Sequence, residues 1–105
     1  VPKRSFLPYA ISKAGLGMLT KNLALELGPQ GVAVVGIAPG GVQSTMADRA
    51  PDVLIASTPI REIAAPEDVA EAVLYLASKS ARFANGSTLV LDGGLMLGPY
   101  TRSDF

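Results

Sequence analysis

The sequence lacks the residue types that build several common kinds of site. Its 105 residues include no cysteine and no histidine. Without cysteine there is no disulfide and no thiolate metal site, and without histidine there is no imidazole base, Ser-His triad or histidine zinc site in this chain. Any acid–base chemistry that these residues perform must therefore come from tyrosine, lysine or a carboxylate.

Charge and long apolar runs are also scarce. Charged residues make up 17% of the chain, with nine basic and nine acidic side chains. The basic residues are scattered and form no stripe of the kind that binds nucleic acid or an anionic membrane. No apolar run reaches the roughly 18–20 residues of a membrane span, and we expect a cytoplasmic protein. At 49% hydrophobic residues, the chain is more apolar than an ordinary soluble domain, which indicates that other protein covers it.

The pattern of apolar residues predicts a helix and then a strand in the first half of the chain. Good helix formers run from Ala10 to Leu27 with apolar residues at helical spacing, and Gly28-Pro29 ends this helix. The segment Val32–Ala38 is rich in Val and Ile and is interrupted only by Gly36. Such a run is typical of a parallel strand that is covered on both faces.

The second half predicts a loop, a helix and a last strand. Val42–Ala65 has no clear period and contains two prolines, so we expect a long loop that can include a helical turn. Pro66-Glu67-Asp68 begins a helix, and we interpret its two carboxylates as helix-start charges. This helix should fade near Ser78 to Ser80. Thr88–Leu91 is predicted to be a buried strand, ended by a structural turn at Asp92-Gly93-Gly94.

The order of these elements predicts the fold class. Two strands joined through a helix form a parallel crossover unit, but a two-stranded parallel sheet cannot bury both faces of strands this apolar. We therefore expect an α/β fold, the C-terminal part of a doubly wound Rossmann-type parallel sheet. Residues 1–105 would be the C-terminal portion of a single domain whose N-terminal half is absent. A first residue of Val1 rather than Met agrees with this expectation.

Tyr9 and Lys13 are the most informative pair of residues in the chain. On a helix, residues four apart project from one face with Cβ atoms about 5–6 Å apart. A tyrosine with its ordinary pKa of about 10 is a poor base near neutrality. A positive charge about 6 Å away favours the phenolate by roughly 3 kcal/mol at an effective dielectric of about 20. The pair therefore suits proton transfer, although the spacing alone also allows two solvated surface residues.

Four motifs carry a resemblance to a known family. They follow one another as Tyr9-Ala10-Ile11-Ser12-Lys13, then Ala38 to Met46, then Pro66 to Ala70 with Leu76-Ala77-Ser78, then Leu91-Asp92-Gly93-Gly94. In this order they resemble the C-terminal portion of a short-chain dehydrogenase/reductase, over nearly all of residues 9–98. The resemblance implies a Rossmann-type fold that binds NAD or NADP. It also implies hydride transfer between that cofactor and an alcohol or carbonyl carbon.

The resemblance assigns roles to individual residues. It implies that Tyr9 is the general acid/base that exchanges a proton with the substrate oxygen. It implies that Lys13 stabilises the tyrosinate and hydrogen-bonds the nicotinamide ribose, so that both residues also belong to the cofactor site. Pro39 and Gly40 match a turn that comes close to the nicotinamide. Val42 matches a residue whose main-chain groups contact the carboxamide.

Further positions follow from the same resemblance. A cofactor-facing hydroxyl, usually Thr in the family, aligns with Ser44, with Thr45 one residue later, and which of the two faces the cofactor stays open. Gly41 and Met46 are the expected substrate contacts. The fairly short, mostly apolar segment 46–61 suits a small or flat carbonyl compound. The family's phosphate loop, Asn motif and catalytic Ser lie upstream of Tyr9, so we expect the isolated chain to be inactive.

We expect a homodimer or homotetramer that forms through the helix over residues 10–27 and the C-terminal strand region, with no metal, nucleic acid or membrane partner. Two alternatives remain open at this point. The first is a non-catalytic nucleotide-sensing or scaffold protein on the same fold. The second is a truncated subunit that serves only oligomer contacts. An intact Tyr9 and Lys13 pair argues against the first alternative, because a sensor has no need of an activated phenol.

Overall fold

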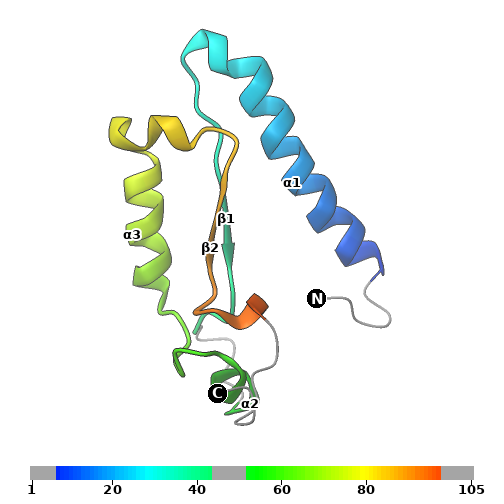
Figure 1. Cartoon of the computed structure of the whole chain (residues 1–105), viewed down its shortest axis with the longest axis vertical. Helices are drawn as coiled ribbons and strands as arrows, with labels where there is room; N and C mark the ends of the chain where they lie inside the picture. Colours follow the sequence, from blue (N-terminus) through cyan, green and yellow to red (C-terminus); the bar gives the residue numbers. More distant parts are fainter. Residues whose placement is uncertain (1–6, 44–51, 98–105) are drawn as a thin grey trace. The chain divides into compact units, whose positions relative to one another are not determined.

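The computed structural model describes residues 7–43 and 52–97. Figure 1 shows the described elements in the predicted order of helix, strand, loop, helix and strand. These are α1 (Leu7–Leu27), η1 (Gly28–Gln30), β1 (Gly36–Pro39), α2 (Asp52–Ser57), α3 (Pro66–Leu76), η2 (Lys79–Ala84), β2 (Thr88–Leu91) and η3 (Leu95–Leu97). Helix α2 is a short helix inside the predicted loop, and the three η elements are short 3-10 helices. None of the described helices is long and apolar enough to cross a membrane.

The chain divides into two compact units. The first unit comprises Val1–Gly36 and Tyr75–Leu89, and the second comprises Ile37–Leu74 and Val90–Phe105. Helix α1 belongs to the first unit, whereas α2 and nearly all of α3 belong to the second. Each unit is described by itself below.

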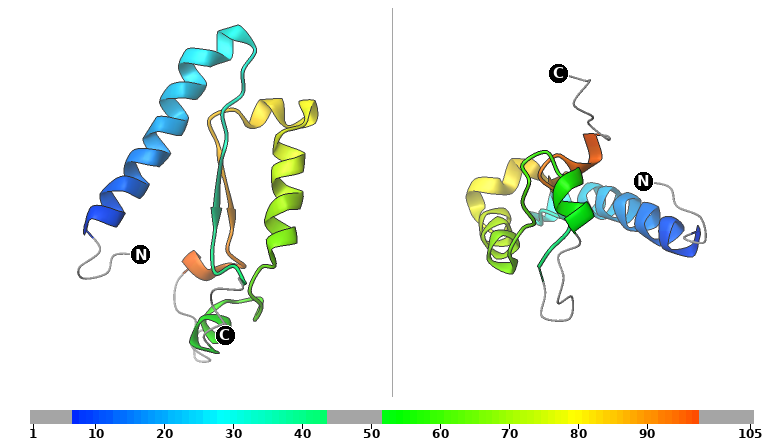
Figure 2. Two further views of the ribbon diagram at one scale, coloured as in Figure 1. Left: turned by 180° about the vertical axis from the view of Figure 1, so that it is seen from behind. Right: turned by 90° about the horizontal axis from the view of Figure 1, so that it is seen from below.

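Strands β1 and β2 lie side by side in a two-stranded sheet (Figure 1; seen from behind in Figure 2). The Gly36 N–H donates to the Ser87 carbonyl at 2.9 Å, and the Gly40 N–H donates to the Leu91 carbonyl at 3.0 Å. Both partners advance by four residues in the same direction, so the strands are parallel. The predicted parallel crossover is therefore confirmed, with α3 in the connection between the strands.

Strand β1 is shorter than the sequence predicts, because the residues before Gly36 bond to a loop instead of a strand. The Val34 N–H donates to Asn85 Oδ1 at 2.8 Å, and the Val34 carbonyl accepts from the Gly86 N–H at 2.8 Å. Because these bonds use the N–H and C=O of Val34, the segment before Gly36 does not continue the strand pairing. The strand also ends at Pro39, one residue later than expected, where the predicted Pro-Gly turn begins.

Burial within the described residues is slight. The buried apolar side chains are Ala24 and Ala81, whereas many large apolar side chains are exposed. Val90 of β2 is 49% exposed, although the sequence predicts burial of this strand on both faces. Two helices and a two-stranded sheet offer too little surface to cover such a strand, as the sequence also indicates. The described residues thus present apolar surface that other protein has to cover.

The start of α3 explains its two acidic residues. Asp68 Oδ2 accepts a hydrogen bond from the Ala65 N–H at 2.8 Å, so a carboxylate in the first turn bonds the backbone just before the helix. This is the side-chain half of a capping box. Glu67 also lies in the first turn, where a negative charge favours the helix dipole. The interpretation of Glu67 and Asp68 as helix-start charges is confirmed.

Candidate functional site

The predicted pairing of Tyr9 and Lys13 is present on α1. Lys13 Nζ lies 5.4 Å from the centroid of the Tyr9 ring, within the range of a cation–π contact. Both side chains are exposed in the first unit. The neighbouring Ser12 hydroxyl donates to the Tyr9 carbonyl at 2.8 Å, so it serves the helix backbone. The Lys13 ammonium therefore lies beside the Tyr9 phenol. Among the described residues, Lys13 forms no salt bridge that would neutralise its charge.

The face of α1 that carries this pair is also the face that packs in the second half of the helix. Tyr9, Lys13, Thr20 and Ala24 follow one another at intervals of four, seven and four residues, which keeps them on one side of a helix. Thr20 and Ala24 are the buried residues of α1. Tyr9 and Lys13 therefore extend a packed face rather than the outer surface of the helix.

The turn after β1 has room for little more than a backbone. A Cβ on Gly40 would lie 2.9 Å from the Asp92 Cβ, and a Cβ on Gly41 would collide with Leu54. Both positions therefore require glycine for space rather than for an unusual φ angle. The family resemblance implies a turn that comes close to the cofactor, and the structure shows a turn that has no space for a side chain on its protein side.

Val42 directs its main-chain groups away from its neighbour in the second unit. The Gln43 N–H donates to the Ala64 carbonyl at 2.9 Å, and the Gly41 carbonyl accepts from the Ala64 N–H at 3.2 Å. Successive residues of an extended chain point their N–H and C=O groups to opposite edges. The Val42 N–H and C=O therefore face away from Ala64, and they have no backbone partner within the described residues.

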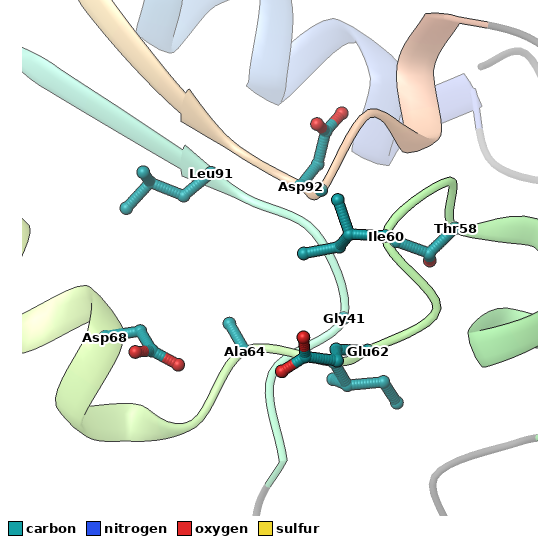
Figure 3. Close-up of a pocket in the computed structure, with 10 residues that line it drawn as sticks. Gly41, Thr58, Ile60, Glu62, Ala64, Asp68, Leu91 and Asp92 are labelled. Carbon is teal, nitrogen blue, oxygen red and sulfur yellow. The ribbon is translucent and has the colours of Figure 1, made fainter.

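The remaining predicted site residues divide between the described and undescribed parts of the chain. Ser44, Thr45 and Met46 lie outside the described residues. Gly41, a predicted substrate contact, lines a pocket of about 270 Å³ in the second unit. Figure 3 shows the residues that line this pocket. They are Gly41, Thr58, Ile60, Glu62, Ile63, Ala64, Asp68, Leu91, Asp92 and Gly93.

Two of the three carboxylates in this pocket already hold backbone groups. Asp92 Oδ1 accepts from the Gly94 N–H at 2.9 Å, and Asp92 Oδ2 accepts from the Met96 N–H at 3.0 Å. In Figure 3 the Asp92 carboxylate points away from the middle of the pocket. Asp68 caps α3, and only Glu62 has no hydrogen-bond partner among the described residues. The carboxylates therefore serve mainly to shape the turns around the pocket.

Close packing explains the two glycines that follow Asp92. Gly93 has φ +64° and Gly94 has φ +93°, a region that side-chain-bearing residues rarely adopt. A Cβ on Gly93 would lie 2.7 Å from Thr58 Cγ2, and Thr58 is buried. The predicted structural role of Asp92-Gly93-Gly94 is thus confirmed.

Sequence reasoning missed most of the pocket. Its residues come from the turn after β1, the segment around Ile60, the start of α3 and the end of β2. No spacing along the sequence connects these four segments, and an isolated Glu62 in a loop gives no signal. Among the described residues, no group of three or more Asp, Glu, His or Cys side chains could hold a metal ion.

The predicted catalytic and cofactor residues fall in different units. Tyr9 and Lys13 belong to the first unit, and Pro39, Gly40 and Val42 belong to the second. The catalytic and cofactor roles of these residues remain predictions. The first unit thus carries an exposed phenol beside a cation, and the second carries a tight turn next to Val42, whose main-chain groups have no backbone partner among residues 7–43 and 52–97.

Comparisons with known proteins agree with the motifs. A family model described as enoyl-(acyl carrier protein) reductase matches residues 1–96. A 3beta-hydroxysteroid dehydrogenase from Eggerthella lenta is 44% identical and covers 94% of this chain. A 3-oxoacyl-(acyl-carrier-protein) reductase from Rickettsia prowazekii is 38% identical over 85% of the chain. The chain spans 40% of the first relative and 39% of the second.

Solved structures show the same fold. A short-chain dehydrogenase from Bacillus anthracis superimposes with a TM-score of 0.76 at 35% sequence identity. The match covers 88% of this chain and 36% of that one. The predicted fold class is therefore confirmed, and the two parallel strands with their helices form part of an α/β Rossmann-type fold.

Proposed function

The chain belongs to the short-chain dehydrogenase/reductase family, and we propose that it carries the proton-transfer residues of an NAD- or NADP-dependent oxidoreductase. The intact protein would interconvert an alcohol and a carbonyl compound. A nicotinamide cofactor, when bound, supplies or accepts the hydride at the substrate carbon. The chain's own residues then have to move one proton at the substrate oxygen and hold the cofactor in place.

Tyr9 moves the proton. When a carbonyl is reduced, the phenolic O–H donates its proton to the substrate oxygen, and when an alcohol is oxidised the phenolate takes that proton back. Lys13 stabilises the phenolate through its charge and donates hydrogen bonds to the nicotinamide ribose. The position of Lys13 Nζ, 5.4 Å from the centre of the Tyr9 ring, is the observation that carries this proposal.

The second unit supplies groups that fit a nicotinamide. A carboxamide offers both a donor and an acceptor, and Val42 presents an N–H and a C=O that have no backbone partner among the described residues. We assign Pro39 and Gly40 to a turn that comes close to the ring, and the 2.9 Å between a Cβ on Gly40 and the Asp92 Cβ means that this turn has no space for a side chain on its protein side. We assign the cofactor-facing hydroxyl to Ser44 or Thr45, and the substrate contacts to Gly41 and Met46.

The first test is Tyr9→Phe in the complete protein. Turnover should fall by about 10²–10⁴-fold, because the variant loses the transferable proton, while cofactor binding should change little. Tyr75→Phe is a matched control, since Tyr75 also lies on a helix and is 55% exposed, against 57% for Tyr9. Steady-state kinetics and cofactor titration measure both quantities. A Tyr9→Phe protein that keeps more than half of wild-type turnover would contradict the proposal where chemistry limits the rate.

We also propose that the outer face of α1 associates with another copy of the protein. Leu7, Ile11, Met18 and Leu25 share this face, opposite to Tyr9, and all four are exposed. Exposed apolar stripes of this kind mark interaction surfaces. Sedimentation of the complete protein should show a dimer or tetramer, and Met18→Glu should shift it towards the monomer. A monomeric wild-type protein would refute this part of the proposal.

A further inference from the structure

The Asn85 side chain joins two segments of the first unit that lie far apart in the sequence. Its Oδ1 accepts from the Val34 N–H at 2.8 Å, and its Nδ2 donates to the Ala24 carbonyl at 3.1 Å. The two partners determine which way the amide faces, because a backbone N–H needs an acceptor and a carbonyl needs a donor. Asn85 therefore connects the end of α1 to the segment that enters β1.

Gly86 brings the same loop closer to the helix. Its φ of +82° suits glycine, and its N–H donates to the Val34 carbonyl at 2.8 Å. A Cβ on Gly86 would lie 3.4 Å from the Ala24 Cβ, and Ala24 is only 4% exposed. The four residues Ala24, Val34, Asn85 and Gly86 thus form one contact, here called the α1 clasp.

The clasp lies at the far end of the helix from the reacting residues. Tyr9 precedes Ala24 by fifteen residues, which corresponds to about 22 Å at about 1.5 Å per residue. Over that length a tilt of about 5° at the clasp would move the phenol by about 2 Å. Misplacement of a reacting group by about 1 Å can cost about 10²-fold in rate. Small changes at the clasp therefore have large consequences at Tyr9.

Within the described residues, contacts to α1 are concentrated near the clasp. Thr20 and Ala24 are its buried residues, and the first half of the helix is exposed. The face that Ala24 presents to the clasp is also the face of Tyr9 and Lys13. The direction in which that face points thus depends on how the end of the helix is held.

We propose that Asn85 is a positioning residue, which acts through the Ala24 carbonyl to set the direction of α1 and hence the place of Tyr9 and Lys13. This inference rests on the proposed role of Tyr9 in proton transfer. Asn85 would thus influence the reaction although it lies far from Tyr9 in the sequence. Asn85 itself need not touch substrate or cofactor.

The test uses Asn85→Asp in the complete protein. Aspartate keeps an oxygen that accepts from the Val34 N–H, but it replaces the donor to the Ala24 carbonyl with a second acceptor. We expect kcat to fall by about 10- to 100-fold while the substrate KM changes by less than about threefold. Ser78→Ala is the control, because the Ser78 hydroxyl bonds the Tyr75 carbonyl and does not contact α1. This control should keep wild-type kcat.

A double-mutant cycle separates positioning from general loss of structure. In a Tyr9→Phe background, Asn85→Asp should lower the remaining turnover by less than about twofold, because the group that it positions is already gone. An equal loss in both backgrounds, or an unchanged kcat for Asn85→Asp alone, would overturn the positioning role. Full activity of Tyr9→Phe would instead refute the proposed function and this inference with it.

If the Asn85→Asp protein does not fold, a second variant can be used in the same double-mutant cycle. Thermal melting of each protein shows whether it is folded at the assay temperature. If Asn85→Asp is not, Asn85→Ser takes its place, since a serine hydroxyl is too short to reach both Val34 and Ala24. The expected fall in kcat and the expected non-additivity with Tyr9→Phe are the same.

Discussion

The first half of α1 and the turn after β2 depend on different properties of their residues. A Cβ added to Gly15 of α1 would meet no heavy atom within 4 Å, whereas a Cβ on Gly93 would lie 2.7 Å from Thr58 Cγ2. Around Tyr9 and Lys13 the chemistry belongs to exposed side chains on a regular helix. At Gly93 the requirement belongs to the backbone and its neighbours. The comparison indicates that the proposed catalytic side chains of α1 have little local packing around them, whereas the turn is closely packed and its glycines bring no side-chain chemistry.

The largest effect that this comparison predicts is on the isolated 105-residue chain. Leu25 of α1 is 78% exposed and Phe83 is 87% exposed, while the buried apolar side chains of the described part are alanines. We expect the isolated chain to aggregate, to remain molten or to associate with itself or with the rest of the fold. Sedimentation measures the association state of the isolated chain, and thermal melting shows whether it unfolds cooperatively. A monomer with a sharp cooperative transition would show that these exposed apolar side chains need no cover.

Lys13→Met in the complete protein should affect activity without affecting the fold. We expect turnover at neutral pH to fall by about 10²-fold and the cofactor KM to rise, because the phenolate and the ribose both lose a cationic partner. Lys21→Met makes the same substitution on the same helix and should have little effect. Equal results for the two variants would mean that Lys13 is an ordinary surface residue.

Gly93→Ala in the complete protein should affect stability first. A left-handed φ costs a side-chain-bearing residue about 1–2 kcal/mol, and the contacts with Thr58 and Ile60 add overpacking of about 1–3 kcal/mol. We therefore expect the free energy of unfolding to fall by about 2–5 kcal/mol in denaturant titrations. Gly15→Ala is the matched control, and it should be neutral or stabilise by up to about 1 kcal/mol. If both substitutions destabilise equally, the two regions do not differ as proposed.

Regular elements with local signals were predictable from the sequence. The helix formers from Ala10 to Leu27 and the terminating Gly28-Pro29 gave α1 to within three residues at its start. Strand β2 lies where the apolar run Thr88–Leu91 placed it. The i, i+4 spacing predicted that Tyr9 and Lys13 would meet, because this contact depends only on helix geometry.

Contacts between distant segments were not predictable in the same way. The start of β1 at Gly36 depends on Asn85 and Gly86. These two residues hydrogen-bond the N–H and C=O of Val34, which are then not available for strand pairing. The pocket around Gly41 gathers four segments with no common spacing. Nothing in the sequence marks these encounters, because a residue's partner across fifty positions depends on how the whole chain folds back.

The sequence by itself determined the order of the main helices and strands, the approximate bounds of α1 and β2, and the pairing of Tyr9 with Lys13, because each depends on interactions within one or a few turns of chain. Only the tertiary structure decided which glycines have no space for a side chain, that the Val42 main-chain groups face away from Ala64, and that Asn85 holds the end of α1. Those features depend on atoms that close packing brings together from separate segments, and close packing leaves no periodic trace along the chain.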